Sequence, residues 1–151
     1  MLRWPAPPHF APMRGGERAA YLVYQLANAG ILLYPLFLTV PAELSWPTAA
    51  GAALYLGGLA LCAASVICFA RPDARGLNRN GVYRYSCNPM YLAYFLCFAG
   101  MAVLTRSWGL FAPVLVFQVC AHRVILAEER ECLARFGEAY RQYLEQVRRY
   151  L

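Results

Sequence analysis

The sequence predicts an all-α integral membrane protein with about four transmembrane helices, and its composition and charge distribution support that fold class. Of its 151 residues, 60% are hydrophobic and 15% are charged, whereas a soluble domain is roughly half apolar and about one quarter charged. The mean hydropathy is +0.39. Four stretches contain no charged side chain, namely residues 19–42, 44–70, 85–105 and 107–122.

The lengths of these stretches support membrane spans. A hydrocarbon core of roughly 30 Å needs about 20 apolar residues in a helix, so the first three stretches are long enough and the fourth is slightly short. We expect the fourth to continue as one helix beyond the membrane. Residues 1–18 do not read as a cleavable signal, because prolines interrupt them and the apolar run begins only after Arg18. We therefore expect the first span to be retained.

The arginines predict the topology. All 14 basic residues are arginine, and 13 of them lie before the first span, between the second and third spans, or from Arg123 onward. The turns on the other side carry Glu43 and Arg106. The positive-inside rule therefore predicts that both termini and the loop 71–84 are cytoplasmic. The formal charge of +6 also suits anionic lipid head groups, whereas a nucleic-acid partner is not expected because the arginines form no single basic face.

The six cysteines and the general composition say less about fold and function than the charge pattern does. No C-x-x-C pair occurs, and Cys62, Cys68, Cys97 and Cys120 fall in apolar spans, so neither a disulfide nor a metal site is expected. The arginine-only, alanine-rich composition fits a GC-rich bacterial genome, and we expect a multi-pass protein of the bacterial inner (plasma) membrane.

A polar cluster precedes the third span. Asn88-Pro89 reads as a helix start, because asparagine is a favourable N-cap and proline suits the first turn. The crowding of Tyr83, Arg84, Tyr85 and Tyr91 near it leaves two interpretations open. One is a well-capped helix with interfacial tyrosines, and the other is a polar ligand site entered from lipid.

The last long segment carries an anomalous carboxylate. One predicted helical face is formed by His122, Ile125, Leu126, Glu129, Leu133 and Phe136. Glu131 has Arg135 four residues on, but neither Glu128 nor Glu129 has a cation at that spacing. A carboxylate on an apolar face beside a membrane is costly without a partner. A loop arginine such as Arg84 is the structural candidate for that partner, and a bound cationic ligand is the functional one.

The chain ends in an amphipathic segment. Gly137 is expected to end the preceding helix, and Tyr140, Tyr143 and Leu144 then recur at helical spacing, so the tail should lie against the protein or the membrane surface. We therefore divide the chain into an N-terminal segment 1–18, a transmembrane domain 19–122 with the cytoplasmic loop 71–84, and a cytoplasmic helical cap 123–151.

Three motifs in this order resemble the integral-membrane methyltransferases, which include isoprenylcysteine carboxyl methyltransferases and phospholipid N-methyltransferases. They are residues 81–92 (GVYRYSCNPMYL), the pair Glu128-Glu129, and residues 136–140 (FGEAY) followed by Tyr143. The resemblance covers about the C-terminal half. Gly57 and Gly58 sit roughly where the phospholipid enzymes place a glycine motif, although small residues also pack transmembrane helices.

The resemblance implies S-adenosylmethionine as the cofactor, yielding S-adenosylhomocysteine, with no metal. It implies cofactor-binding roles for Asn88, Pro89, Tyr91, Leu92, Glu128, Glu129, Tyr140 and Tyr143. It also implies catalytic roles for Arg84, Asn88 and Glu129, with Arg84 near the lipid-facing entry, where it can hold a carboxylate or phosphate.

The implied acceptor is a membrane lipid or another hydrophobic molecule. The Asn-Pro-Met-Tyr form favours N-methylation of an amine head group such as phosphatidylethanolamine. Cys87 stands where many relatives have arginine, which removes an anion contact. An isoprenylcysteine-type carboxyl or small-thiol methyltransferase is the alternative. A non-enzymatic four-span transporter or assembly protein is the second alternative, although no acidic residue lies centrally in a span.

Overall fold

The computed structural model describes residues 15–41, 43–72 and 76–150, and every regular element in that part of the chain is helical. The elements are α1 (Gly16–Leu33), η1 (Tyr34–Phe37), α2 (Trp46–Phe69), η2 (Gly81–Arg84), α3 (Pro89–Leu104), α4 (Trp108–Phe136) and α5 (Glu138–Gln146). The all-helical prediction is confirmed. Most of the N-terminal segment predicted over 1–18, three positions of the loop 71–84, and the last residue of the cap lie outside the described residues.

Three helical segments are long and apolar enough to cross a membrane: Gly16–Phe37, Trp46–Phe69 and Trp108–Phe136. Helix α3 is apolar but has only 16 residues, so three of the four expected spans reach the required length. Helix α4 continues without a break for 29 residues, as expected from the fourth charge-free stretch. Gly137, with φ 55°, ends it at the predicted position.

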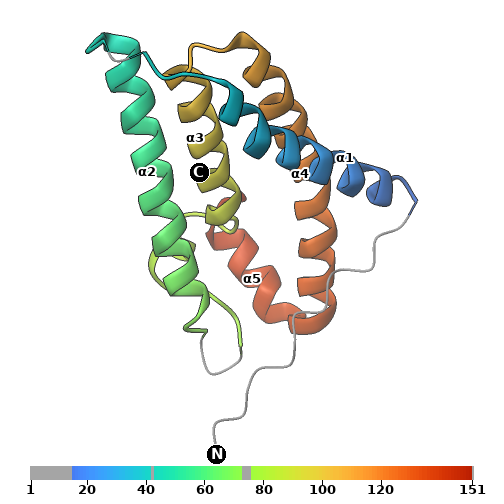
Figure 1. Cartoon of the computed structure of the whole chain (residues 1–151). Helices are drawn as coiled ribbons and strands as arrows, with labels where there is room; N and C mark the ends of the chain where they lie inside the picture. Colours follow the sequence, from blue (N-terminus) through green and yellow to red (C-terminus); the bar gives the residue numbers. More distant parts are fainter. Residues whose placement is uncertain (1–14, 42, 73–75, 151) are drawn as a thin grey trace, which may run out of the picture.

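The helices are arranged as two pairs (Figure 1). Helix α1 packs chiefly against α4, and α2 packs chiefly against α3. Helices α2, α3 and α4 run alongside one another, while α1 crosses α4 at a steep inclination. Helix α5 turns back from the end of α4 and lies across one end of the assembly, below α3 in this view.

Glycines set the close approach of α2 and α3. A Cβ atom added at Gly58 would lie 2.7 Å from the backbone nitrogen of Cys97, and one added at Gly100 would lie 2.6 Å from the backbone nitrogen of Tyr55. Gly51 is similarly crowded by Leu104, whereas a Cβ at Gly57 would meet no atom of the described neighbours within 4 Å. Gly58 therefore serves helix packing in the small-residue manner of membrane helices.

The core and the periphery both fit a membrane setting. The core between α1, α3 and α4 contains the fully buried side chains of Ile31, Leu110 and Phe117. Leu26 on α1 and Val119 on α4 are 73% and 69% exposed, respectively. Such exposed apolar side chains suit lipid contact, because acyl chains solvate them without the cost that water imposes.

Candidate functional site

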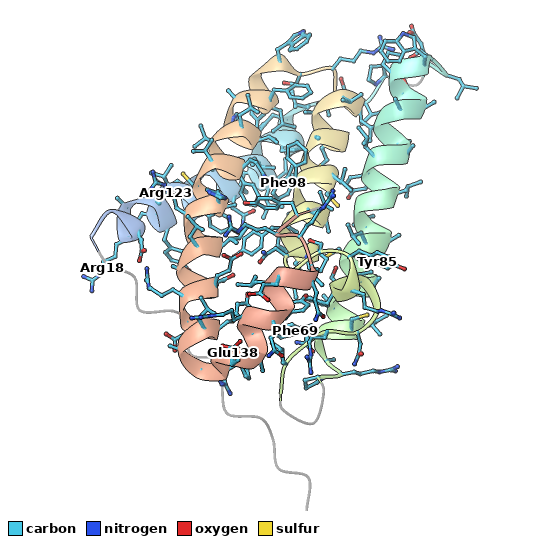
Figure 2. All side chains as sticks on the ribbon, turned by 180° about the vertical axis from the view of Figure 1, so that it is seen from behind. Arg18, Phe69, Tyr85, Phe98, Arg123 and Glu138 are labelled. Atoms are coloured by element: carbon cyan, nitrogen blue, oxygen red, sulfur yellow. The ribbon has the colours of Figure 1, made fainter. Side chains whose placement is uncertain are left out.

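A cavity of about 530 Å³ is lined by residues of both helix pairs and of α5. In Figure 2, α5 lies close to the end of α2 that carries Phe69. Residues from all five α-helices, from η2 and from the loop before it line the cavity, so it collects side chains from distant parts of the sequence. The predicted site residues among them are Asn88, Pro89, Tyr91, Glu128, Glu129, Tyr140 and Tyr143.

Helix α5 closes one side of this cavity. Its residues Tyr140 and Tyr143 are buried against Leu77 of the loop. The Tyr143 hydroxyl donates a hydrogen bond of 2.6 Å to the backbone carbonyl of Tyr83. The predicted amphipathic tail helix is thus confirmed, and its apolar face packs on the protein.

The chain after α5 forms a strap, residues 147–150, along the start of α3. The backbone N–H of Cys87 donates to the carbonyl of Arg148 at 2.9 Å, and the Asn88 side-chain amide donates to the carbonyl of Arg149 at 3.2 Å. Tyr150 is hydrogen-bonded to Nδ1 of His122 at 2.7 Å. Asn88 does stand at the N-cap position of α3, but its side chain bonds to the strap and makes no side-chain cap hydrogen bond.

Glu129 finds its cation in this strap. Arg149 donates to both carboxylate oxygens, from Nε to Oε1 at 2.8 Å and from Nη2 to Oε2 at 2.9 Å. The Glu129 side chain is 7% exposed and that of Arg149 is 42% exposed. The expectation that a loop arginine such as Arg84 meets Glu129 is wrong, because the strap brings Arg149 to this carboxylate and leaves Arg84 exposed outside the cavity lining.

Glu128 has a different environment. Its Oε1 accepts a hydrogen bond of 3.1 Å from the Tyr91 hydroxyl. Within the described part of the chain, Glu128 has no ion pair. The two adjacent carboxylates therefore differ, since Glu129 is compensated by Arg149 and Glu128 presents its charge to the cavity.

Two further polar groups lie on the cavity wall. Oδ1 of Asn78 is buried and has no hydrogen-bond partner among the described residues, and an unpaired buried acceptor is costly unless a ligand donates to it. Burial raises the pKa of the Cys87 thiol to about 11, so this side chain is neutral at physiological pH and supplies no anion contact.

The structure separates the predicted site residues into two groups. All seven cavity residues named above come together, whereas Arg84 is exposed and neither it nor Leu92 lines the cavity. The buried face of α4 also differs from the predicted one, because Leu126 and Leu133 are each 37% exposed while Val124 is buried.

Sequence reasoning missed several residues of the site. Tyr24, Tyr94 and Asn78 line the cavity, and Arg149 reaches it through Glu129. Tyr24 and Tyr94 sit within apolar stretches, where a tyrosine is not distinctive. Arg149 is one of a run of tail arginines, and its spacing gives no sign that it meets Glu129.

The fold and site thus define a helical membrane protein with a capped, partly acidic cavity between two helix pairs. Residues 46–139 match the phospholipid methyltransferase family, and the chain belongs to that family. Over 66 residues it is 33% identical to Methanethiol S-methyltransferase 1 from Bradyrhizobium diazoefficiens, a match that covers 44% of this chain and 22% of that protein. The matched stretch is thus about one fifth of the relative's length. No solved structure matches the chain.

Proposed function

We propose that this protein is an integral-membrane, S-adenosylmethionine-dependent methyltransferase acting on an amine head group of a lipid or lipid-like acceptor. Membership of the phospholipid methyltransferase family supports a transfer of methyl groups. The observation that carries the proposal is the capped cavity, in which a compensated carboxylate and an uncompensated one stand side by side at Glu129 and Glu128.

The residues of the cavity fit this cofactor. A volume of about 530 Å³ falls within the range of small-molecule sites. The carboxylate of Glu129 can accept hydrogen bonds from ribose hydroxyls, and Oδ1 of Asn78 can accept one from an exocyclic amine. Tyr140 and Tyr143 offer ring surface beside them.

The chemistry asks the protein mainly for alignment. When bound, the cofactor would supply a sulfonium-activated methyl group for transfer to the acceptor nitrogen, with S-adenosylhomocysteine as the leaving group. Positioning of two reactants can lower a barrier by about 7 to 11 kcal/mol. An amine acceptor must also release a proton, which the uncompensated carboxylate of Glu128 or a water can take. Glu129, held by Arg149, has the positioning role.

The membrane arrangement proposed for this function has four spans, α3 being the shortest, with α5 and the strap in the cytoplasm. Arginine placement supports this sidedness. The lipid tail would then enter sideways from the bilayer while its head group reaches the cavity. Reporter fusions to either end of the chain should report a cytoplasmic location, and an external location of the C-terminus would refute the arrangement.

A small thiol is the second candidate acceptor. It is favoured by the similarity to Methanethiol S-methyltransferase 1. A thiol acceptor would need no cationic-head-group site, so the two candidates differ in the ligands that should bind the cavity.

Calorimetric titration of the detergent-purified protein with S-adenosylmethionine and S-adenosylhomocysteine tests the proposal. We expect micromolar binding that Glu129→Gln weakens far more than Glu131→Gln, with Glu145→Gln, which changes an exposed residue outside the cavity lining, as the control. A labelled-methyl screen of amine lipids and thiols then selects the acceptor. Absence of binding both in detergent and with lipid restored would favour a transporter or assembly protein.

A further inference from the structure

We propose that Tyr24, Tyr91 and Tyr94, together with Glu128, form a subsite for the methylated ammonium head group of the acceptor. This subsite rests on the proposed methyltransferase function, and it gives a role to the part of the cavity that Tyr24 of α1 lines. Tyr24 lies outside the region matched by the family, which begins at residue 46.

The ring of Tyr91 neighbours the rings of both Tyr24 and Tyr94. The ring centroids of Tyr24 and Tyr91 are 6.5 Å apart and tilted, and those of Tyr91 and Tyr94 are 6.5 Å apart in an edge-to-face arrangement. All three rings line the cavity. A cation within about 6 Å of a ring centroid is attracted by the ring's quadrupole, and aromatic cages recognise quaternary ammonium groups in this way.

Charge supports a cationic occupant. The Tyr91 hydroxyl bonds to Glu128 at 3.1 Å, which places a carboxylate at the edge of this ring cluster. Because Glu128 has no ion pair within the described residues, a cationic ligand is the group that would compensate its charge among these rings.

The position of the cluster favours the acceptor over the cofactor. Tyr24, Tyr91 and Tyr94 all pack against the hydrophobic core that contains Phe117, and Tyr24 stacks on Phe117 with centroids 4.7 Å apart, so the cluster borders the apolar core. The polar groups suited to a nucleoside, such as Asn78 and Tyr143, belong instead to the loop before η2 and to α5.

The test uses a cationic amphiphile and a neutral counterpart of equal chain length. The full-length protein in maltoside micelles is titrated calorimetrically with dodecyltrimethylammonium and with dodecyldimethylamine N-oxide, each below its own micellar concentration. The protein's formal charge of +6 gives the cation no general electrostatic attraction. We expect saturable binding of the cation at least tenfold tighter than that of the N-oxide.

Four variants locate that binding. Tyr24→Leu and Glu128→Gln should each lower the affinity for the cation at least tenfold. Tyr24→Phe should keep the wild-type affinity because the ring face remains. Tyr34→Leu, at the other end of the same apolar segment and outside the cavity lining, should have no effect. Thermal unfolding in the same detergent identifies any variant that has lost its fold. If Tyr24→Leu is such a variant, the test rests on Tyr24→Phe, which should retain binding of the cation, and on Glu128→Gln, which should lose it.

Titration of the same variants with S-adenosylmethionine and S-adenosylhomocysteine distinguishes an acceptor ammonium group from the cofactor's sulfonium group. Equal binding of the two amphiphiles, or no loss in Tyr24→Leu and Glu128→Gln, would overturn the proposal. If Tyr24→Leu instead weakens the binding of S-adenosylmethionine but not of S-adenosylhomocysteine, the rings hold the cofactor's sulfonium group, and the assignment to the acceptor is wrong. If neither cofactor form binds the wild type, the proposed function is refuted. The amphiphile titration still shows whether the ring cluster binds a cation.

Discussion

Arg149 binds both carboxylate oxygens of Glu129 across twenty residues of sequence, at 2.8 and 2.9 Å. The same residue accepts a hydrogen bond from the Asn88 side chain through its backbone carbonyl. One residue of the strap therefore contacts two residues to which the family resemblance gives catalytic roles, and it couples the end of the chain to the cavity.

Loss of this ion pair should destabilise the protein and impair the site. Arg149→Met leaves the Glu129 carboxylate buried without a cation, and because the arginine is half exposed we expect a loss of about 2 to 3 kcal/mol in the free energy of unfolding, below the value for fully buried pairs. Thermal or denaturant unfolding in detergent measures this loss, with the exposed Arg148→Met as the control. A double-mutant cycle with Glu129→Gln should show coupling between the two positions, and additive effects would contradict the structure.

The glycines of the α2–α3 interface should differ sharply in their tolerance of a methyl group. Gly100→Ala and Gly58→Ala place the new Cβ 2.6 to 2.7 Å from backbone nitrogens of the facing helix. Each should therefore lower the free energy of unfolding by about 1 to 3 kcal/mol. Gly57→Ala meets open space and should be neutral or slightly stabilising. Melting temperatures of the three variants in one detergent make the comparison, and equal effects would refute this packing.

The Cys87 thiol should react slowly with alkylating reagents. Burial raises its pKa to about 11, so at pH 8 its thiolate fraction is far below that of a free cysteine, whose pKa is about 8.5. We expect the alkylation rate by iodoacetamide to keep rising up to about pH 11, as followed by mass spectrometry of the peptide that contains Cys87. Because the folded pKa is the higher one, stability should fall as the pH rises above 9. A reaction at pH 8 as fast as that of a free cysteine would contradict the buried environment.

Arg84 should affect the acceptor and leave the cofactor untouched. It is exposed and absent from the cavity lining, so Arg84→Gln should change the affinity for S-adenosylhomocysteine by less than twofold. If it holds an anionic group at the entry, the same variant should raise the KM for a phosphate-bearing acceptor several-fold. Calorimetry and a methyl-transfer assay measure the two quantities. A tenfold loss of cofactor affinity would place Arg84 in the cavity instead.

The hydroxyl of Tyr143 should hold the cap in place. Tyr143→Phe removes its hydrogen bond to the Tyr83 carbonyl and leaves that buried acceptor unpaired, at a cost of about 1 to 3 kcal/mol. Hydrogen exchange of the backbone amides of α5 should therefore accelerate, while exchange in α2 stays unchanged. Unchanged protection of α5 would show that other contacts of the cap suffice.

Local sequence signals predicted the helices well and the site in part. Charge-free runs located α1 to α4, and Gly137 marked the end of α4, because apolar length and glycine conformation act locally. The motif residues around Asn88 and Glu128 pointed to the cavity through the family resemblance. The predicted helical face around Glu129 was partly wrong, since Leu126 and Leu133 are partly exposed. A protein in lipid can turn apolar side chains outward, so apolar spacing does not identify the buried face.

The sequence by itself determined the helical class, the membrane character and the presence of an anomalous carboxylate pair, because the length of an apolar stretch and the absence of a cation one turn away are both local properties of the chain. Only the tertiary structure decided which carboxylate is compensated. Arg149 reaches Glu129 because Gly137 reverses the chain and α5 carries the strap back along α3. The tertiary structure likewise brought Tyr24 of α1 beside Tyr91 of α3, since contacts between distant helices depend on how their faces pack and leave no periodic trace in either segment.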